Sequence, residues 1–395
     1  MSDIQSIGRA RLILVSGFGW MFDAMDILML SYILAYLGNQ LGWGGVERSI
    51  VILANNLGLL IGATLFGYLA DIIGRKKVFM ITLGMYSVLA AFQGFIRDHV
   101  DLAIVRFFMG LGLGGELPVA STMVSELSRP EERGRNVILL ESFWAYGTIL
   151  AAAISAFLMP RIGYTNTMLL LSLTALYIVV LRRSIPEPII ERASRSRVAI
   201  ADLITTSRRV TLISWTAWFS IAFGYYGAFL WLPQILVSKG FGVIRSLEYT
   251  FYMALAQIPG YFSAAYMVER LGRRPTFIAY MVASAVSAYL LAISTSHIDI
   301  LLWGSLLNFF NLGAWGVIYA YTPELFKAPY RATGTGSSGS LARVGMIIGP
   351  LVPTATGSFE TSLAIFGLVW VIGSLSVLGA PETKLRVKPV ASQRL

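Results

Sequence analysis

The sequence predicts an all-α integral membrane protein with twelve transmembrane helices. Three observations lead to this prediction. Apolar residues make up 56% of the 395 residues and charged residues only 13%, against about 25% charged in soluble domains. Apolar runs of about 20 residues, the length that crosses a bilayer, recur along the chain. Lysines and arginines gather in alternate connections between these runs, which is typical of loops on one side of a membrane.

The expected spans follow one another with short connections. The first begins after Arg9 and Arg11. It is far longer than the apolar region of a signal peptide, which has about 7–15 residues, so we expect it to remain in the mature protein. In order along the chain, the runs that predict the twelve spans are 12–37, 49–69, 78–96, 102–125, 137–159, 164–181, 211–236, 249–268, 276–294, 300–322, 337–357 and 361–379.

The distribution of positive charge predicts the orientation. With the N-terminus inside, 24 of the 31 lysines and arginines fall in cytoplasmic segments and five fall outside. This bias places both termini in the cytoplasm of a multi-pass protein of the plasma membrane. Topology thus accounts for the formal charge of +10. Nucleic acid is not needed as a partner; the expected partner is the lipid bilayer, and we expect a monomer.

The composition excludes several kinds of chemistry. The chain has no cysteine and two histidines, His99 and His297. Disulfide scaffolds, thiolate metal sites and thiol catalysis are therefore excluded, and two histidines are too few for a His-rich metal centre. No nucleophile–histidine arrangement of an enzyme stands out. We expect neither enzymatic activity nor a metal or cofactor.

The two halves of the chain match at one constant offset of 198 residues. The matching pairs include Trp20 with Trp218, Gly74 with Gly272, His99 with His297, Glu126 with Glu324, Arg133 with Arg331 and Gly147 with Gly345. One offset without gaps indicates an internal duplication. It predicts two six-helix bundles in the same orientation, 1–181 and 211–395, joined by an Arg-rich cytoplasmic linker at 182–210. Such parallel repeats build one class of secondary transporters.

A basic loop between spans two and three returns in the second half. It runs from Gly67 to Lys77, and its weaker copy is Glu269–Pro275. Both copies resemble the signature loop of the major facilitator superfamily. The resemblance implies the major facilitator fold and a gating role, in which acids and cations hold one side closed. With the similar inner loops after spans four and ten, the residues it points to are Gly67, Asp71, Gly74, Arg75, Lys77, Glu126, Arg133, Glu269, Arg273, Glu324 and Arg331.

Charged residues inside the spans are candidates for proton coupling, because such charges are costly in a bilayer. Asp26 and Arg106 correspond to an acid–arginine pair in similar sugar and organic-acid porters, and the alternative is a static buried salt bridge. Asp23 is the other candidate, since Asp23 and Asp26 resemble the paired acids of aromatic-acid/proton symporters, although Ala24 stands where that family usually has glycine. Glu116, in a glycine-rich stretch, either faces a cavity or bonds a neighbouring helix.

A closer resemblance runs from Gly110 to Gly147 and continues at 236–241 and 255–261. These segments are similar to the bacterial niacin transporters. The resemblance implies a secondary transporter that moves nicotinate or a similar small aromatic carboxylate with protons. The alternatives are a sugar or organic-cation porter of the same superfamily and a transporter-like receptor that moves no solute.

Several side chains are expected to bind the substrate. Arg343 lies where similar organic-anion transporters carry an arginine, which suits a carboxylate clamp; the alternatives are an arginine at the lipid interface or a partner for a gate acid. Glu141 is about 6 Å inside span five and is either functional or interfacial. Flat rings suit an aromatic substrate, and buried amides avoid lipid. These candidates are Phe143, Trp144, Tyr225, Tyr226, Trp231, Trp315, Gln234, Gln257, Asn308 and Asn311, with Trp218 and Tyr319 as further cavity candidates.

Overall fold

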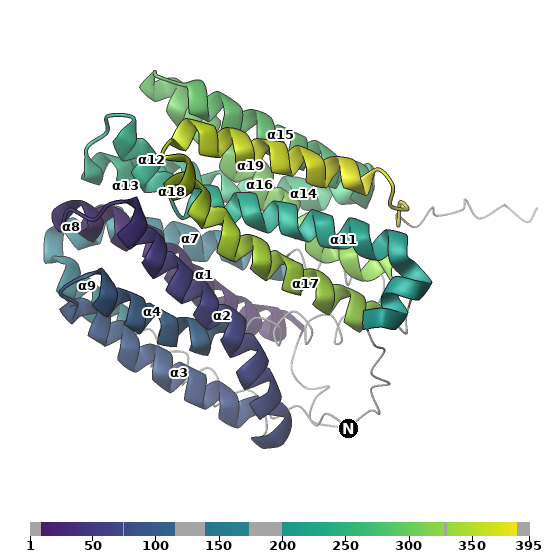
Figure 1. Ribbon diagram of the computed structural model, residues 1–395, viewed down its shortest axis with the longest axis horizontal. Helices are drawn as coiled ribbons and strands as arrows, with labels where there is room; N and C mark the ends of the chain where they lie inside the picture. The colour runs from purple at the N-terminus through teal and green to yellow at the C-terminus, as the bar shows by residue number, and fades with distance from the viewer. Residues whose placement is uncertain (1–8, 74, 115–138, 174–199, 328–329, 385–395) are drawn as a thin grey trace, which may run out of the picture.

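The computed structural model describes residues 9–73, 75–114, 139–173, 200–327 and 330–384, and every regular element among them is a helix. The helices run along the long axis of the molecule (Figure 1). Those of the first half form one bundle and those of the second half another, coloured purple to blue and teal to yellow. Of the expected sites, Glu116, Glu126, Arg133 and Gly74 lie outside the described residues, as does most of the linker.

The first bundle contains three long helices and several shorter ones. A turn of π-helix at Ile154–Leu158 joins α7 to α8. The helices are α1 (Arg9–Gln40), α2 (Gly45–Ile73), α3 (Arg75–Phe92), α4 (His99–Gly114), α7 (Phe143–Ala153), α8 (Met159–Ile162) and α9 (Tyr164–Ser172).

The second bundle contains more interrupted helices. Its first helix begins inside the expected linker 182–210 and is kinked at Ser207. The helices are α11 (Ile200–Phe229), α12 (Leu232–Ser238), α13 (Val243–Leu255), α14 (Gln257–Arg270), α15 (Arg273–Ile293), α16 (His297–Leu325), α17 (Arg331–Ile348), α18 (Val352–Thr356) and α19 (Phe359–Val377).

Prolines explain where three expected spans are interrupted. Pro233 follows the 50° bend between α11 and α12, Pro259 follows the break between α13 and α14, and Pro350 lies in the 3₁₀ turn after α17. A proline has no N–H and clashes with the carbonyl four residues earlier, so each of these residues disturbs the preceding helical turn.

Six described helices are long and apolar enough to cross a membrane, or seven if the bent pair α11–α12 is one span. The six are Gly17–Gln40, Gly45–Gly62, Leu139–Ile162, Arg273–Ile293, His297–Leu325 and Phe359–Val377. Among the other expected spans, 249–268 coincides with the broken pair α13–α14. The span 337–357 includes α17, whose glycine and serine lower its hydropathy, and the spans 102–125 and 164–181 continue beyond the described residues. The full count of twelve therefore stays a prediction.

Glycines allow equivalent helices of the two halves to touch. A Cβ atom on Gly147 of α7 would lie 2.1 Å from the carbonyl oxygen of Met21 on α1. At the positions 198 residues later, a Cβ on Gly345 of α17 would lie 2.7 Å from the carbonyl oxygen of Phe219 on α11. Only glycine permits such close backbone approach. The same helix contact thus occurs at equivalent places in both halves.

The spacing of Gly110 and Gly114 has the same purpose in α4. A Cβ on either would lie within 2.3 Å of a carbonyl oxygen of α2, and Gly58 and Gly62 of α2 are equally close to α4. The four glycines therefore form a reciprocal packing face between these two helices.

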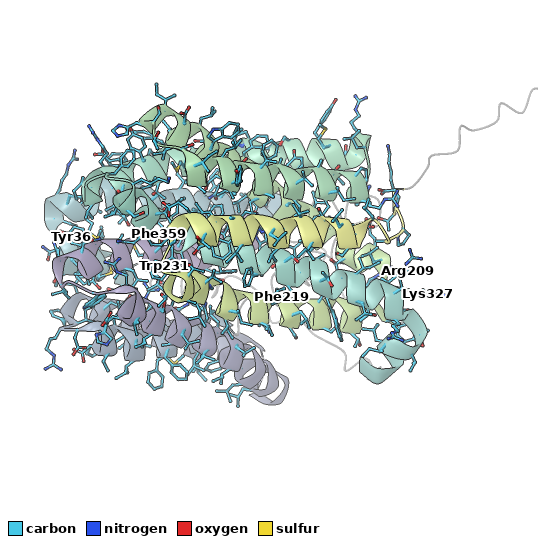
Figure 2. All side chains as sticks on the ribbon, turned by 45° about the horizontal axis from the view of Figure 1, so that its top comes forward. Tyr36, Arg209, Phe219, Trp231, Lys327 and Phe359 are labelled. Carbon is cyan, nitrogen blue, oxygen red and sulfur yellow. The ribbon has the colours of Figure 1, made fainter. Side chains whose placement is uncertain are left out.

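The two bundles join at one end of the molecule, where residues 41–44 connect α1 to α2. We call this end the hairpin end. There, Asn39 Nδ2 donates to Gln234 Oε1 over 3.1 Å. Thr354 Oγ1 lies 2.6 Å from Ser49 Oγ and donates to the carbonyl oxygen of Gly45. Figure 2 shows Tyr36, Trp231 and Phe359 at this end and Arg209 and Lys327 at the opposite end.

Candidate functional site

A cavity lies between the two bundles near the middle of the molecule. Its volume is about 60 Å³, which is room for several water molecules. Both halves of the chain contribute to its wall, and seven of the nine lining side chains are aromatic. They are Trp20, Glu141 and Trp144 from the first half and Tyr225, Tyr226, Tyr261, Leu312, Trp315 and Tyr319 from the second.

Helix periodicity brings these side chains to the cavity. Leu312, Trp315 and Tyr319 are three and four residues apart on α16, so they form one stripe on the face of that helix. Glu141 and Trp144 have the same spacing at the start of span five. Side chains on the faces of helices therefore form these parts of the cavity wall.

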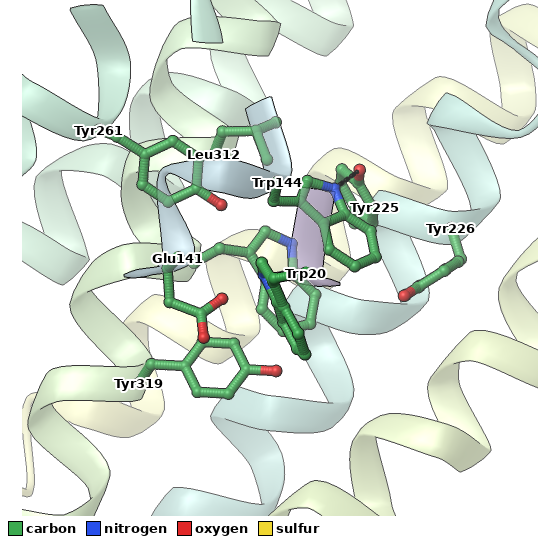
Figure 3. Close-up of a pocket in the computed structure, with 9 residues that line it drawn as sticks. Trp20, Glu141, Trp144, Tyr225, Tyr226, Tyr261, Leu312 and Tyr319 are labelled. Atoms are coloured by element: carbon green, nitrogen blue, oxygen red, sulfur yellow. Dashed lines mark hydrogen bonds between the residues drawn. The ribbon is translucent and has the colours of Figure 1, made fainter. Parts of the chain in front are cut away.

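The aromatic rings contact one another across the boundary between the bundles. Trp144 Nε1 donates to the Tyr225 hydroxyl over 2.7 Å (Figure 3). The ring centroids of Trp20 and Tyr319 lie 6.5 Å apart, edge to face. Trp315 contacts Tyr225 at 5.7 Å and Tyr319 at 5.9 Å. These separations are typical of favourable aromatic pairs, so the rings form a continuous apolar wall with its polar atoms at the edges.

Glu141 is the carboxyl group among the described residues of this wall. Its side chain points toward Trp20 and Tyr319 (Figure 3), and the residue is only 2% exposed. Neither Glu141 Oε1 nor Trp20 Nε1 forms a hydrogen bond with a described residue, and Trp315 Nε1 is equally unpartnered. The cavity wall therefore contains a carboxyl acceptor and indole donors beside its tyrosine hydroxyl groups.

Arg343 of α17 lies behind two tyrosines of the cavity. Its charge acts on the hydroxyl groups of Tyr226 and Tyr319. The side chain is partly exposed and forms no hydrogen bond or ion pair with the described residues. Its guanidinium is thus close to the cavity with its donors unused, although it is not part of the wall.

Asp26 of α1 and Arg106 of α4 are brought together by the structure. Arg106 Nη1 lies 3.2 Å from Asp26 Oδ2 and 3.1 Å from the Asp26 carbonyl oxygen. Arg106 is 0% exposed and Asp26 4% exposed. The pair expected from the sequence thus exists inside the first bundle, away from the described cavity wall. Asp23 is also buried, at 6% exposed.

The expected amides and two of the expected aromatic residues lie elsewhere. Gln257 Nε2 donates to Asn308 Oδ1 over 2.7 Å inside the second bundle, and the Asn311 amide is buried there without a described partner. Gln234 and Trp231 belong to the hairpin end. Phe143 packs on Phe18 at 5.7 Å. None of these side chains lines the described cavity.

Three lining residues were not among the expected substrate-binding side chains. They are Trp20, Tyr261 and Leu312. The internal repeat could have identified Trp20 as a cavity residue, because it pairs Trp20 with Trp218, whose ring contacts Trp315 and Tyr319. The alternative of a shallow, interfacial Glu141 is wrong, since its carboxyl group lies in the central cavity.

The expected gating residues of the second half form a network within one bundle. Arg273 Nη2 donates to Glu324 Oε1 over 3.1 Å, and Arg331 Nε donates to the carbonyl oxygen of Pro323. The backbone N–H groups of Arg273 and Arg274 donate to Glu382, which caps the start of α15. Glu269 is exposed at the end of α14.

The expected gating residues of the first half lie on two helices. Gly67 and Asp71 lie on α2, and Arg75 and Lys77 lie at the start of α3.

No group of three His, Asp or Glu side chains in the described ranges could hold a metal ion. The described side chains of the site offer the chemistry of recognition: stacking by aromatic rings, hydrogen bonding at their edges, and a charge from Arg343 or Glu141.

Comparison with known proteins gives both family and fold. The Major Facilitator Superfamily model matches residues 16–262 and 246–394. The putative niacin/nicotinamide transporter NiaP of Bacillus subtilis is 44% identical over 96% of this chain and 95% of its own length. The niacin transporter NiaP of Acinetobacter baylyi is 38% identical over 94% of both chains.

A solved structure shows the same fold. The xylose transporter XylE from E. coli, in a partially occluded inward-open conformation, superposes with a TM-score of 0.75 over 93% of this chain and 98% of its own, at 15% identity. Two bundles around a central cavity, the family match in both halves and these near-full-length relatives agree. The chain belongs to the major facilitator superfamily and is a multi-pass membrane transporter, not an enzyme.

Proposed function

We propose that this protein transports nicotinate or a closely similar planar aromatic carboxylate across the plasma membrane by alternating access. The observation that carries the proposal is the cavity between the bundles, with its seven aromatic side chains. Relatives at 44% and 38% identity named as niacin transporters support this substrate class. A flat ring binds such a wall through stacked and edge-to-face contacts.

In this proposal Arg343 binds the substrate carboxylate. Its guanidinium has no described partner and acts on Tyr226 and Tyr319 at the cavity. A guanidinium presents paired donors that match the two oxygens of a carboxylate, and such charged hydrogen bonds are stronger than neutral ones. The aromatic wall then selects a flat substrate, and Arg343 selects an anion.

The bundles rock about this cavity, and the hairpin end is the closed side in this structure. We infer that the hairpin end faces outward. The bias of lysine and arginine toward the opposite end supports this orientation, as do Arg209 and Lys327 there (Figure 2). Both termini are then cytoplasmic. Transport is coupled to protons, and the buried Asp26–Arg106 pair helps to hold α1 against α4 during rocking.

Uptake of labelled nicotinate into proteoliposomes tests the proposal. Unlabelled nicotinate competes fully, whereas nicotinamide, which has the same ring without the charge, competes on the order of tenfold less well, since a hydrogen bond to a charged group contributes about 1.5–3 kcal/mol. Arg343→Gln loses this preference for the acid. Arg245→Gln, at an exposed arginine of α13, keeps it. Absence of uptake by folded protein, or equal competition by the two compounds, would falsify the proposal.

A further inference from the structure

Glu141 is a buried acid that forms no ion pair with a described residue. The groups that face it come from four helices: the Trp20 indole N–H from α1, the Tyr226 hydroxyl from α11, the Tyr261 hydroxyl from α14 and the Tyr319 hydroxyl from α16. Arg343 acts on two of these tyrosines but forms no ion pair with Glu141. Among the described residues that line the cavity, those that face Glu141 are thus aromatic rings or neutral donors.

Such surroundings accommodate a carboxylic acid better than a carboxylate. An isolated ionised carboxylate inside an apolar cavity loses its hydration without compensation, and a buried group in this position takes up a proton instead. Glu141 is 2% exposed, and its Oε1 atom has no described hydrogen-bond partner. The closed cavity therefore holds Glu141 as the neutral acid.

Asp26 is in the opposite situation. Its carboxylate lies 3.2 Å from the Arg106 guanidinium, and the two charges compensate one another. Removal of one partner from a buried pair leaves an uncompensated charge, which costs about 3–5 kcal/mol. Protonation of Asp26 would leave Arg106 in that state. Of Asp26 and Glu141, Glu141 is the one that can exchange a proton without exposing an unpaired charge.

We propose that Glu141 is the side chain that carries the proton that moves with the substrate. The assignment rests on the proposed function. When the cavity opens to the outside, the Glu141 carboxylate takes a proton from water and becomes neutral. The bundles rock with the acid neutral, and after the cavity opens to the cytoplasm Glu141 releases that proton to water. The empty protein then returns with Glu141 ionised, and the Arg343 guanidinium, which has released the substrate carboxylate and lies near the same two tyrosines, offsets the Glu141 charge. One proton thus moves inward per cycle, together with the substrate anion.

The position of Glu141 suits this role. It belongs to the first bundle, whereas Tyr226, Tyr261 and Tyr319, which enclose it, belong to the second. Rocking of the bundles therefore separates Glu141 from its enclosure and admits water. An acid enclosed by its own bundle, such as Asp26 with Arg106, keeps its surroundings when the bundles rock as rigid bodies.

Two transport assays distinguish a role of Glu141 in carrying the proton from a role in binding the substrate. Proteoliposomes with native protein, Glu141→Gln and Glu141→Asp are compared for nicotinate accumulation under an inward proton gradient and for exchange of labelled against unlabelled nicotinate without a gradient. We expect Glu141→Gln to exchange at within about threefold of the native rate while its gradient-driven accumulation falls more than tenfold. Glu141→Asp, which keeps the acid, retains accumulation, and so does Glu248→Gln, the matched change on α13 outside the cavity.

The outcomes distinguish this assignment from the proposed function. Undiminished accumulation by Glu141→Gln, loss of exchange together with accumulation in this variant, or native accumulation that ignores the gradient would each overturn the assignment and leave nicotinate transport intact. Native protein that neither exchanges nor accumulates nicotinate would instead overturn the proposed function.

Labelling of the native protein covers the case in which the variant does not fold. Dicyclohexylcarbodiimide adds to protonated carboxyl groups in apolar surroundings. Mass spectrometry of the peptides should find the adduct at Glu141 and not at Asp26, with nicotinate protecting Glu141. An adduct absent from Glu141, or formed at Asp26 in its place, would contradict the assignment.

Discussion

At the scale of single residues, the Asp26–Arg106 pair shows how a buried charge is tolerated here. Arg106 is 0% exposed, and its Nε and Nη2 atoms have no partner among the described residues. Arg106 therefore contacts Asp26 through one charged contact and one bond to its backbone carbonyl. Such pairs are sensitive to the loss of one member, whereas the loss of both members together is often tolerated.

We expect Arg106→Leu alone to lower the free energy of unfolding by about 3–5 kcal/mol, because Asp26 then stays buried without its cation. The double variant Asp26→Leu/Arg106→Leu should recover more than half of that loss. Thermal unfolding of the purified proteins in detergent measures both. Equal destabilisation of the single and double variants would mean that packing, and not charge compensation, dominates at this site.

At the scale of helices, prolines of the second bundle create acceptors that the first bundle uses. Pro233 lacks the N–H that would bond the Phe229 carbonyl, and Ser31 Oγ of α1 donates to that carbonyl over 3.2 Å. Pro350 likewise leaves the Met346 carbonyl free, and Asn56 Nδ2 of α2 donates to it over 2.7 Å. In a membrane such freed carbonyls must find another donor. The helix breaks therefore also tie the two bundles together.

Ser31→Ala should destabilise the protein by about 1 kcal/mol, the usual net contribution of a hydrogen bond, since the Phe229 carbonyl loses its donor. The matched control is Ser376→Ala, whose hydroxyl donates to the Gly373 carbonyl within its own helix. Melting temperatures in detergent compare the two. A smaller shift for Ser31→Ala than for the control would show that the carbonyl is satisfied in another way.

The glycine contacts permit a second helix-scale prediction. In Gly147→Ala the added methyl group would lie 2.1 Å from the Met21 carbonyl oxygen, so α1 and α7 must separate. Overpacking of this kind costs about 1–3 kcal/mol. Gly336→Ala, where no atom lies within 4 Å of the new Cβ, should instead be stabilising by about 0.5–1 kcal/mol, because alanine loses less conformational entropy in a helix. Thermal unfolding that ranks the two variants in the reverse order would contradict this packing.

At the scale of the whole molecule, the closed hairpin end can be tested by cross-linking. The chain contains no cysteine, so an introduced pair has no competitor. Ser49→Cys/Thr354→Cys replaces two side chains whose oxygens lie 2.6 Å apart on opposite bundles. We expect oxidation to lower nicotinate uptake by about 90% or more, because a disulfide across a moving interface locks the two bundles together. A reductant should restore uptake.

A matched pair within one bundle controls for cysteine itself. Ser214 and Ser338 lie 2.8 Å apart, oxygen to oxygen, on α11 and α17 of the second bundle. A disulfide there joins helices that rock together, so uptake should persist. If the Ser49→Cys/Thr354→Cys disulfide forms and uptake continues, the bundles do not part at the hairpin end during transport.

The family and the fold class could be predicted from the sequence because both depend on local patterns. Apolar runs, the offset of 198 residues and the loop at 67–77 are read directly along the chain. Glu141, Trp144, Tyr225, Tyr226 and Trp315 were expected to bind substrate, and they do line the cavity. Gln257, Asn308 and Asn311 were expected there too, but they face the interior of the second bundle. The polarity of a side chain in a span predicts that it does not face lipid. It does not predict whether the side chain faces the cavity or the interior of one bundle.

The sequence predicted a duplicated, membrane-spanning chain with its positive charge on one side, because spans, repeats and loop charges can be read along the chain. The folded structure was needed to show that Trp20, Tyr261 and Leu312 share a cavity with Glu141, that Arg106 pairs with Asp26 inside one bundle, and that hydrogen bonds join the two bundles at the hairpin end. These facts depend on how helix faces from distant parts of the chain rotate and pack against one another, and packing of that kind is a property of the folded bundles as a whole.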